Sequence, residues 1–362
     1  MKTEIRTLTT TVALLSLAAV AQAQFSPGDL VVVRVGDGVD TLANNTGPIS
    51  LLELGTSGTV VGSPVNIPSG NSGLQISGTA TSEGQLSLNA DGTALILAGY
   101  VPPFTGSGSL SSRTATQAPR GYVTIDYNRN VSSTTTLPNS PYGGQNIRSG
   151  FASGSSFWFA GSGTASGNGL VYYNGTSSST IQGINSRVLG YYGGNLYYST
   201  SSGTQGIYKY SGLPTSATSA SPFLTGVASQ GTSPYDFVLS PDGNTLYVAD
   251  DAIGVQKFSL TAGNWTFDYN FTDGLTANEA YGLTVDFSGA NPVIYWTSPS
   301  DIWEATDAGS GTIGASILSA GANYAFRGLD FAPQSIPEPS ACALMGMGLA
   351  GLWGLQRRNR KA

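Results

Sequence analysis

Carboxylates are the side chains of this sequence with the clearest capacity for chemistry. The chain of 362 residues has 21 Asp and Glu residues, one cysteine and no histidine. Without histidine, Ser-His-Asp triads, Cys-His pairs and the usual zinc sites are excluded. Two carboxyl groups could still serve as the acid and the base of glycoside hydrolysis. Several carboxylate and carbonyl oxygens together could bind a hard cation such as Ca²⁺.

Acids in predicted loops are the candidates for such a cation site. Asp250 and Asp251 directly follow a predicted strand, and we take them as candidate metal ligands. The competing interpretation is that they are solvated turn residues, because Asp is favoured in turns for local reasons. No stretch matches an EF-hand or an RTX repeat, so we predict no cofactor, with Ca²⁺ as the one ion that this pair would take. The other loop acids are Asp37, Asp40, Asp301, Glu304 and Asp307.

The sequence contains no recognisable catalytic motif. It has no Gly-x-Ser-x-Gly elbow, no phosphate-binding loop and no dinucleotide fingerprint in a βα context. We therefore predict that the protein is not an enzyme. Aromatic residues among Asn, Ser and Thr are a better lead, since such faces can stack on sugar rings, although packing inside sheets is their commoner role. These residues are Trp158, Tyr191, Tyr192, Tyr197, Tyr198, Tyr208, Tyr210, Trp265, Trp296 and Trp303.

Short strands must position all of these residues. Apolar residues make up 40% of the chain, charged residues only 10%, and no segment has a helical amphipathic period. A weak repeat organises the strands. Its best copy, residues 236–251, reads as a strand, a Pro-Asp-Gly-Asn turn and a second strand. The other copies are residues 86–99, 150–160, 188–199 and 283–296, and residues 327–333 are a first strand with no second strand after it.

The spacing of this repeat predicts a closed ring of blades. The turn glycines are separated by roughly 40 to 60 residues, the length of one four-stranded propeller blade with its loops. Residues 327–333 can pair with residues 29–35 and the hairpin at about 49–66, which removes the open edge of the ring. We predict an all-β fold, a β-propeller with six blades, with seven blades as the alternative and a β-sandwich or solenoid as the competing architecture. The turn glycines are Gly92, Gly154, Gly194, Gly243 and Gly289.

The N-terminus has the three parts of a secretory signal peptide. A charged start precedes an apolar run at residues 12–20, and a small-x-small end follows. We predict a signal peptide over residues 1–23, with Ala21 and Ala23 at the cleavage site. The alternative is a retained membrane anchor, but the apolar run is shorter than the about 20 residues that span a bilayer.

The C-terminus combines a proline motif, an apolar segment and a basic cluster, in that order. Pro337, Glu338 and Pro339 precede the apolar residues 341–355. Because proline breaks helices and basic residues stay on the cytoplasmic side, this order predicts a transmembrane helix that ends an exported chain. Cys342 lies inside the segment and is expected to pack as a small hydrophobe. The basic stop consists of Arg357, Arg358, Arg360 and Lys361.

This tail, residues 336–362, resembles the PEP-CTERM sorting signal. In that family an exosortase, an integral membrane enzyme, recognises the Pro-Glu-Pro motif and cleaves near it. The family occurs in Gram-negative bacteria that make exopolysaccharide and biofilm. The resemblance implies an exosortase as partner, transient membrane insertion through residues 341–355, and a final location in the cell envelope, at the outer surface or in the extracellular matrix. It implies nothing about the body at residues 24–335, the predicted propeller domain.

The body is more acidic than the whole chain. The two ends hold six of the fifteen basic residues and two of the 21 acids, which leaves 9 positive and 19 negative charges, a net charge of −10. An acidic body repels phosphate backbones, so we predict no binding to nucleic acid.

Two functional hypotheses follow for the body. The favoured one is an exported propeller with a non-catalytic binding or structural role at the cell surface, associated with exopolysaccharide. The alternative is a metal-assisted hydrolase or lyase that acts on polysaccharide or a lactone at one channel mouth, with a cation held by at least three acids. The Ser-Pro-Asp-Gly hairpin at residues 240–243 resembles those of lactonase-like and surface-layer propellers, which implies the fold and leaves both hypotheses open.

Overall fold

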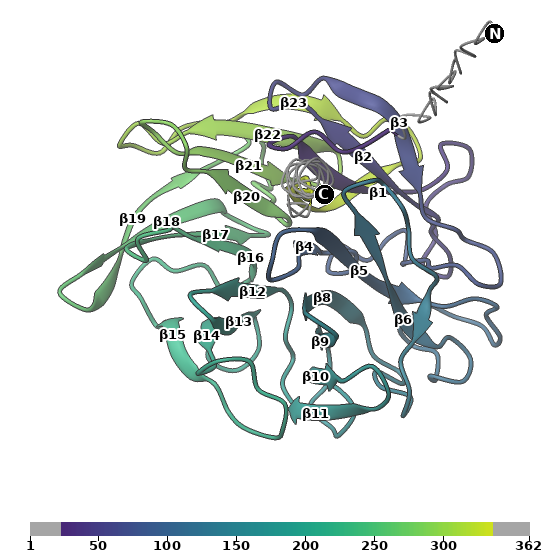
Figure 1. The fold of residues 1–362 in the computed structure, drawn as a ribbon. Coiled ribbons are helices and arrows are strands. Elements are labelled where there is room, and N and C mark those ends of the chain that lie inside the picture. Colours follow the sequence, from purple (N-terminus) through teal and green to yellow (C-terminus); the bar gives the residue numbers. More distant parts are fainter. Residues whose placement is uncertain (1–22, 336–362) are drawn as a thin grey trace, which may run out of the picture.

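The computed structural model describes residues 23–335 and forms a ring of six antiparallel sheets around a central channel (Figure 1). Each sheet has four strands, so the predicted six-bladed β-propeller is confirmed. The described part of the chain contains no helix of the length and hydropathy needed to cross a membrane. The predicted signal peptide up to residue 22 and the predicted transmembrane helix and basic stop lie outside the described residues.

Each blade begins with an inner strand at the channel, and the inner strands of neighbouring blades contact one another. Blade 1 contains β24 (Ala325–Phe331), β1 (Leu30–Val35), β2 (Ile49–Leu54) and β3 (Val60–Asn66). Blade 2 contains β4 (Leu86–Leu88), β5 (Ala94–Tyr100), β6 (Arg120–Asp126) and β7 (Thr135–Thr136). Blade 3 contains β8 (Ile147–Ser153), β9 (Ser156–Gly161), β10 (Leu170–Tyr173) and β11 (Ser178–Gln182).

The remaining three blades follow the same order from the channel outwards. Blade 4 contains β12 (Leu189–Tyr192), β13 (Asn195–Thr200), β14 (Gly206–Lys209) and β15 (Ser221–Thr225). Blade 5 contains β16 (Pro234–Leu239), β17 (Thr245–Asp250), β18 (Gly254–Thr261) and β19 (Asn264–Phe271). Blade 6 contains β20 (Leu283–Asp286), β21 (Val293–Thr297), β22 (Asp301–Thr306) and β23 (Ala315–Ser319).

The repeat found in the sequence is the hairpin between the inner strand and the second strand of a blade. Between β16 and β17, Asp242 Oδ1 accepts hydrogen bonds from Ser240 Oγ at 2.5 Å and from the Asn244 N–H at 3.1 Å. Gly243 has a φ of 74°, a left-handed conformation that glycine adopts without strain. The turn therefore sets the register in which Leu239 pairs with Leu246.

The ring closes in the predicted way. β24 pairs antiparallel with β1, with Leu30 opposite Phe331 and Val32 opposite Leu329. Blade 1 thus takes one strand from the C-terminal end of the body and three from the N-terminal end, so the channel-side edge of β1 is paired. After β24, the Gln334 N–H donates to the Gly92 carbonyl at 2.8 Å, which fixes residue 334 beside the hairpin turn of blade 2.

Inner strands approach each other backbone to backbone at two glycines. A Cβ atom on Gly282 would lie 2.8 Å from the Leu329 nitrogen, and a Cβ atom on Gly328 would lie 2.3 Å from the Leu86 nitrogen. Real Cβ atoms do not come this close to backbone atoms. Only glycine therefore fits where blade 6 adjoins blade 1 and where blade 1 adjoins blade 2.

Candidate functional site

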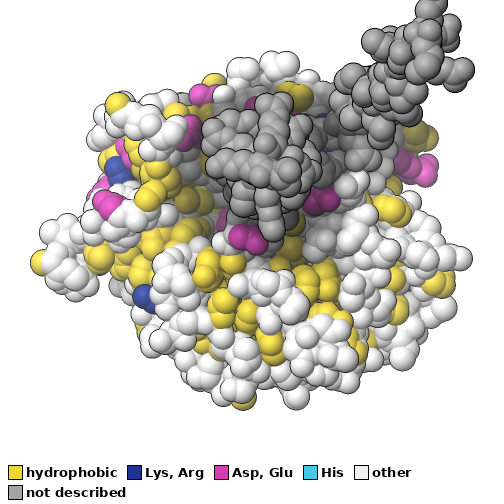
Figure 2. All heavy atoms as spheres, viewed as in Figure 1, with side chains coloured by type: hydrophobic (Ala, Val, Ile, Leu, Met, Phe, Trp, Pro, Cys, Tyr) yellow, Lys and Arg dark blue, Asp and Glu magenta, His cyan; other side chains and the backbone are white. Residues whose placement is uncertain are grey.

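A cavity of about 810 Å³ occupies the channel mouth at which the inner strands run into their hairpin turns. Its lining includes residues from the inner strands of all six blades. This volume lies inside the range of about 300–1,000 Å³ that is usual for small-molecule sites. The face of the molecule in Figure 2 shows more acidic than basic side chains and a largely uncharged surface. We call the cavity at this channel mouth the mouth cavity.

Aromatic rings and amides line the mouth cavity together with the aliphatic side chains of the inner strands. Tyr191 stacks on Phe151, with ring centres 4.9 Å apart and planes at 24°. The Tyr192 hydroxyl donates to the Phe237 carbonyl at 2.7 Å, which fixes the ring of Tyr192 between blades 4 and 5. The other polar lining groups include Asn89, Asn195, Lys209, Ser240 and Asp242. Flat apolar faces beside hydrogen-bonding groups are the chemistry of carbohydrate recognition.

Two carboxyl groups besides Asp242 also line the mouth cavity. Asp236 on β16 accepts from its neighbour Phe237 N–H at 2.8 Å and from the Leu283 N–H of blade 6 at 3.0 Å. Asp330 on β24 likewise accepts from the Leu88 N–H of blade 2 at 2.8 Å. Each carboxylate therefore joins the inner strands of two neighbouring blades.

Both carboxyl groups hold their protons more tightly than ordinary Asp residues. Burial raises the pKa of Asp330 to about 6, although two backbone N–H bonds oppose the change. Burial also raises the pKa of Asp236, and the nearby charge of Asp330 adds to that rise. Neither residue was among the candidate acids. The available signal was that both lie in first strands of the repeat, but their orientation toward the channel is set by the fold.

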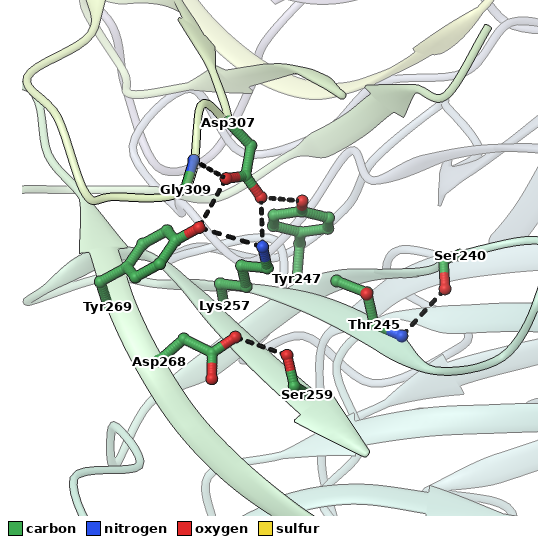
Figure 3. A network of polar contacts seen from close by, with 9 residues as sticks. All are labelled: Ser240, Thr245, Tyr247, Lys257, Ser259, Asp268, Tyr269, Asp307 and Gly309. Carbon is green, nitrogen blue, oxygen red and sulfur yellow. Dashed lines mark hydrogen bonds and ion pairs between the residues drawn. The ribbon is translucent and has the colours of Figure 1, made fainter. Parts of the chain in front are cut away.

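A second cavity of about 390 Å³ lies between blades 5 and 6, and we call it the side cavity. It shares four lining residues with the mouth cavity, so the two spaces adjoin. The shared residues are Ser240, Pro241, Asp242 and Phe287. The polar contacts drawn in Figure 3 include Tyr247, Lys257, Asp307 and Gly309, which belong to the lining of the side cavity.

Asp307, one of the predicted loop acids, is the centre of this network. It forms an ion pair with Lys257, with Nζ 2.7 Å from Oδ2, and accepts from the Tyr269 hydroxyl at 2.6 Å and from the Tyr247 hydroxyl. Burial pushes the pKa of Asp307 up, but these bonds and one from the Gly309 N–H outweigh it, so the pKa lies below its ordinary value. Asp307 therefore stays ionised and bound to Lys257.

The candidate metal ligands Asp250 and Asp251 lie in a different environment. Asp250 is buried and its two oxygens accept from the Ser233 N–H at 2.8 Å and the Ala252 N–H at 3.0 Å. Asp251 is half-buried beside it. Within residues 23–335, no three acidic or cysteine side chains come together in a way that could hold a metal ion. The cation site required by the metal-assisted hypothesis is thus without support from the described residues.

The remaining predicted residues serve the fold locally. Asp37 accepts from the Val39 and Asp40 N–H groups of its own turn, and Asp301 accepts from Ser316 Oγ and Ser319 Oγ. Of the predicted aromatics, six are buried in the sheets, namely Trp158, Tyr197, Tyr198, Tyr210, Trp296 and Trp303. Tyr191 and Tyr192 line the mouth cavity, as does the buried Tyr197. The half-buried Tyr208 and Trp265 belong to neither cavity lining.

The start of the inner strands, at the other end of the channel, is rich in arginine. Arg327 is buried and donates to three backbone carbonyls at 2.7–3.0 Å. The guanidinium carbon of Arg187 lies 3.9 Å from the centre of the Tyr235 ring. Burial lowers the pKa of Arg148 to about 10, and the charge of Arg187 adds to this effect. Because these groups bond mainly to backbone carbonyls and a ring of the next blade, this end holds the blades together.

Comparisons with known proteins identify the tail and the fold. Residues 335–361 match the family model described as the PEP-CTERM protein-sorting motif, which confirms the resemblance seen in the sequence. Proteins with this motif are recognised by an exosortase and exported to the cell surface. The chain is therefore a six-bladed β-propeller that carries a PEP-CTERM sorting motif. No curated protein matches it in sequence.

Solved structures are similar in fold at low sequence identity. A chain of the nidogen/laminin complex is 10% identical, with a TM-score of 0.54 over 84% of this chain and 100% of that chain. A Bacteroides fragilis protein provisionally described as a 6-phosphogluconolactonase is 14% identical, with a TM-score of 0.45 over 83% and 98% of the two chains. The periplasmic gluconolactonase of Pseudomonas aeruginosa is 13% identical, with a TM-score of 0.44 over 76% and 78%. The likeness to the first shows the fold alone, and the other two scores are too low to add to it.

Proposed function

We propose that this protein is a carbohydrate-binding propeller of the cell surface or extracellular matrix, which holds part of an exopolysaccharide in its mouth cavity and does not cleave it. The observation that carries the proposal is the mouth cavity itself. It lies in a chain with a surface-sorting motif and is lined by stacked aromatic rings, amides and hydroxyls. Sugars present C–H faces and hydroxyl groups, which pair with rings and amides.

Tyr191 is the residue through which the proposal is tested. Its ring is half-buried and stacks on Phe151 at the cavity wall, and we propose that the exposed part of the ring packs on a sugar. We expect Tyr191→Ala to weaken binding of a neutral oligosaccharide about fivefold or more, since a stacked ring contributes on the order of 1 kcal/mol or more. The measurement is calorimetric titration of the full-length chain with cellohexaose, maltohexaose and chitohexaose.

Tyr208→Ala is the matched control. Tyr208 is also a half-buried tyrosine of blade 4 and also stacks on an aromatic ring, Tyr198, at 5.3 Å, but it does not line the mouth cavity. The control variant is expected to bind like the wild type. If no oligosaccharide binds to the wild type, or if both variants lose the same affinity, carbohydrate binding in the mouth cavity is wrong.

Hydrolysis is the second candidate, because Asp236 and Asp330 are two protonatable carboxyls in one cavity. A pair of this kind could supply an acid and a base. Against this, each carboxyl already accepts two backbone N–H bonds, one from the next residue of its own strand and one from the neighbouring blade. The binding proposal expects no new reducing ends when the protein is incubated with the same oligosaccharides. If the wild type releases new reducing ends and Asp236→Asn does not, hydrolysis is favoured instead.

A further inference from the structure

The geometry of the two cavities points to a linear, uncharged glycan that runs from the mouth cavity into the side cavity, which acts as a second subsite. We infer this as a refinement of the proposed carbohydrate binding, on which it rests. The direction of the glycan follows from one observation. The lining of both cavities includes Ser240, Pro241, Asp242 and Phe287. A chain leaving the mouth cavity over these residues enters the side cavity directly.

The volumes favour a chain over a single sugar. The mouth cavity of about 810 Å³ already has the size of a complete small-molecule site, and the side cavity adds about 390 Å³ next to it. A compact ligand would leave the side cavity empty. A linear polymer presents the same unit repeatedly and can fill both spaces.

The side cavity offers groups that suit hydroxyls. The Lys257 ammonium has three N–H bonds and uses two, one to Asp307 and one to the Tyr269 hydroxyl at 3.0 Å. No described residue accepts the third N–H, and the Lys257 side chain is 18% exposed, so this N–H can reach a ligand. Phe287 supplies an apolar face at the junction, where a sugar ring can pack. The subsite thus combines one donor with one ring face.

The charges select against acidic glycans. Asp307 neutralises Lys257, so the side cavity has no net positive charge from this pair. Asp242, at the junction, is exposed, and bonds from its own turn lower its pKa, with Ser240 Oγ as the main contributor. Asp236 and Asp330 in the mouth cavity become negatively charged only above their raised pKa values, and Lys209 is the one basic residue of the described lining. A uronic acid polymer would bring carboxylates toward these acids, and like charges repel.

The experiment compares ligands of different length and charge. We expect the affinity of the full-length chain to rise at least about tenfold from the disaccharide to the hexasaccharide of whichever neutral series binds, because about 1.4 kcal/mol from a second subsite gives that factor. Oligogalacturonate of matched length is expected to bind at least tenfold more weakly than the neutral hexasaccharide. The probes are the cello-, malto- and chito-oligosaccharide series.

Two variants locate the second subsite. Thr245 lines only the side cavity, and its backbone N–H makes the bond to Ser240, so Thr245→Trp fills the space and keeps that bond. Thr245→Trp is expected to abolish the rise in affinity from the disaccharide to the hexasaccharide and to leave the affinity for the disaccharide unchanged. Thr266→Trp is the matched control, since Thr266 lies two strands further out in the same row, opposite Ser259, and lines neither cavity. Lys257→Met, which removes the free donor, is expected to reduce the gain as well.

The outcomes separate this inference from the function on which it rests. If disaccharide and hexasaccharide bind equally well, or if Thr245→Trp keeps the full gain, the second subsite is wrong and carbohydrate binding stands. If oligogalacturonate binds as tightly as the neutral chain, the charge argument fails. If no oligosaccharide binds, both proposals fall. Melting temperatures of the two tryptophan variants show whether a loss of affinity reflects misfolding. If Thr245→Trp is misfolded, the rise in affinity with length that is measured for Lys257→Met decides whether the second subsite exists.

Discussion

Gly328→Val is expected to lower the free energy of unfolding of the body by about 4 kcal/mol or more, or to prevent folding. A Cβ atom at this position would lie 2.3 Å from the Leu86 nitrogen and 2.7 Å from the Gln85 Cα atom. Both are backbone atoms, which cannot rotate away as a side chain can. The inner strands β24 and β4 would have to separate at the blade that closes the ring. Urea unfolding of the full-length chain, followed by tryptophan fluorescence, measures the loss.

Gly289→Ala is the control for this prediction. Gly289 lies in the turn after β20, has no left-handed φ and would place a Cβ atom no closer than 3.4 Å to its nearest neighbour, the Asn291 carbonyl. This substitution is expected to change stability by less than about 0.5 kcal/mol. Equal urea midpoints for the two variants would mean that blades 1 and 2 do not approach as closely as described.

Asp330→Asn is expected to remove a large part of the pH dependence of stability. Burial raises the pKa of Asp330 to about 6, above its ordinary value of 3.8. Between these two pH values the folded protein binds a proton that the unfolded chain has released, so the wild type loses stability as the pH rises through this window. The shift corresponds to a loss of up to about 3 kcal/mol between pH 4 and pH 7. The asparagine cannot ionise and should not show this loss.

The measurement is the urea midpoint of both proteins at pH 4 and at pH 7.5. Asp236 contributes a loss in the same direction, so the quantity of interest is the difference between the two slopes. Asp242→Asn is the control, because bonds from its own turn lower the pKa of Asp242 and its effect has the opposite sign, lost as the pH falls. Identical slopes for the wild type and Asp330→Asn would contradict the buried state of this carboxyl.

The architecture was predictable because it depends on local sequence patterns. The hairpin of residues 240–243 depends on bonds within a few residues, such as Asp242 to Ser240 and Asn244, so it is visible in the sequence. The spacing of such hairpins gave the blades, and an unpaired strand at residues 327–333 gave the closure. Each inference needed only residues that are close in the chain, or a strand that lacked a partner.

The site depends on contacts between blades and was largely missed. Asp236 and Asp330 come from blades 5 and 1, and only the closed ring places both in one cavity. Asp307 was noticed as a loop acid, but its partner Lys257 lies on another blade, so the ion pair could not be foreseen. Asp250 was selected for its place after a strand, whereas in the structure its oxygens are occupied by the Ser233 and Ala252 N–H groups.

The hydrogen bond from Gln334 to Gly92 gives the tail a fixed point of departure. Gly92 is part of the mouth cavity lining, and the sorting motif begins at residue 335, whose Cα atom lies about 3.8 Å from that of Gln334. An exosortase that recognises the sorting motif therefore acts on a segment that follows directly from the rim of the mouth cavity. Recognition of the motif is thus expected to affect access to the mouth cavity as well as the place where the protein resides.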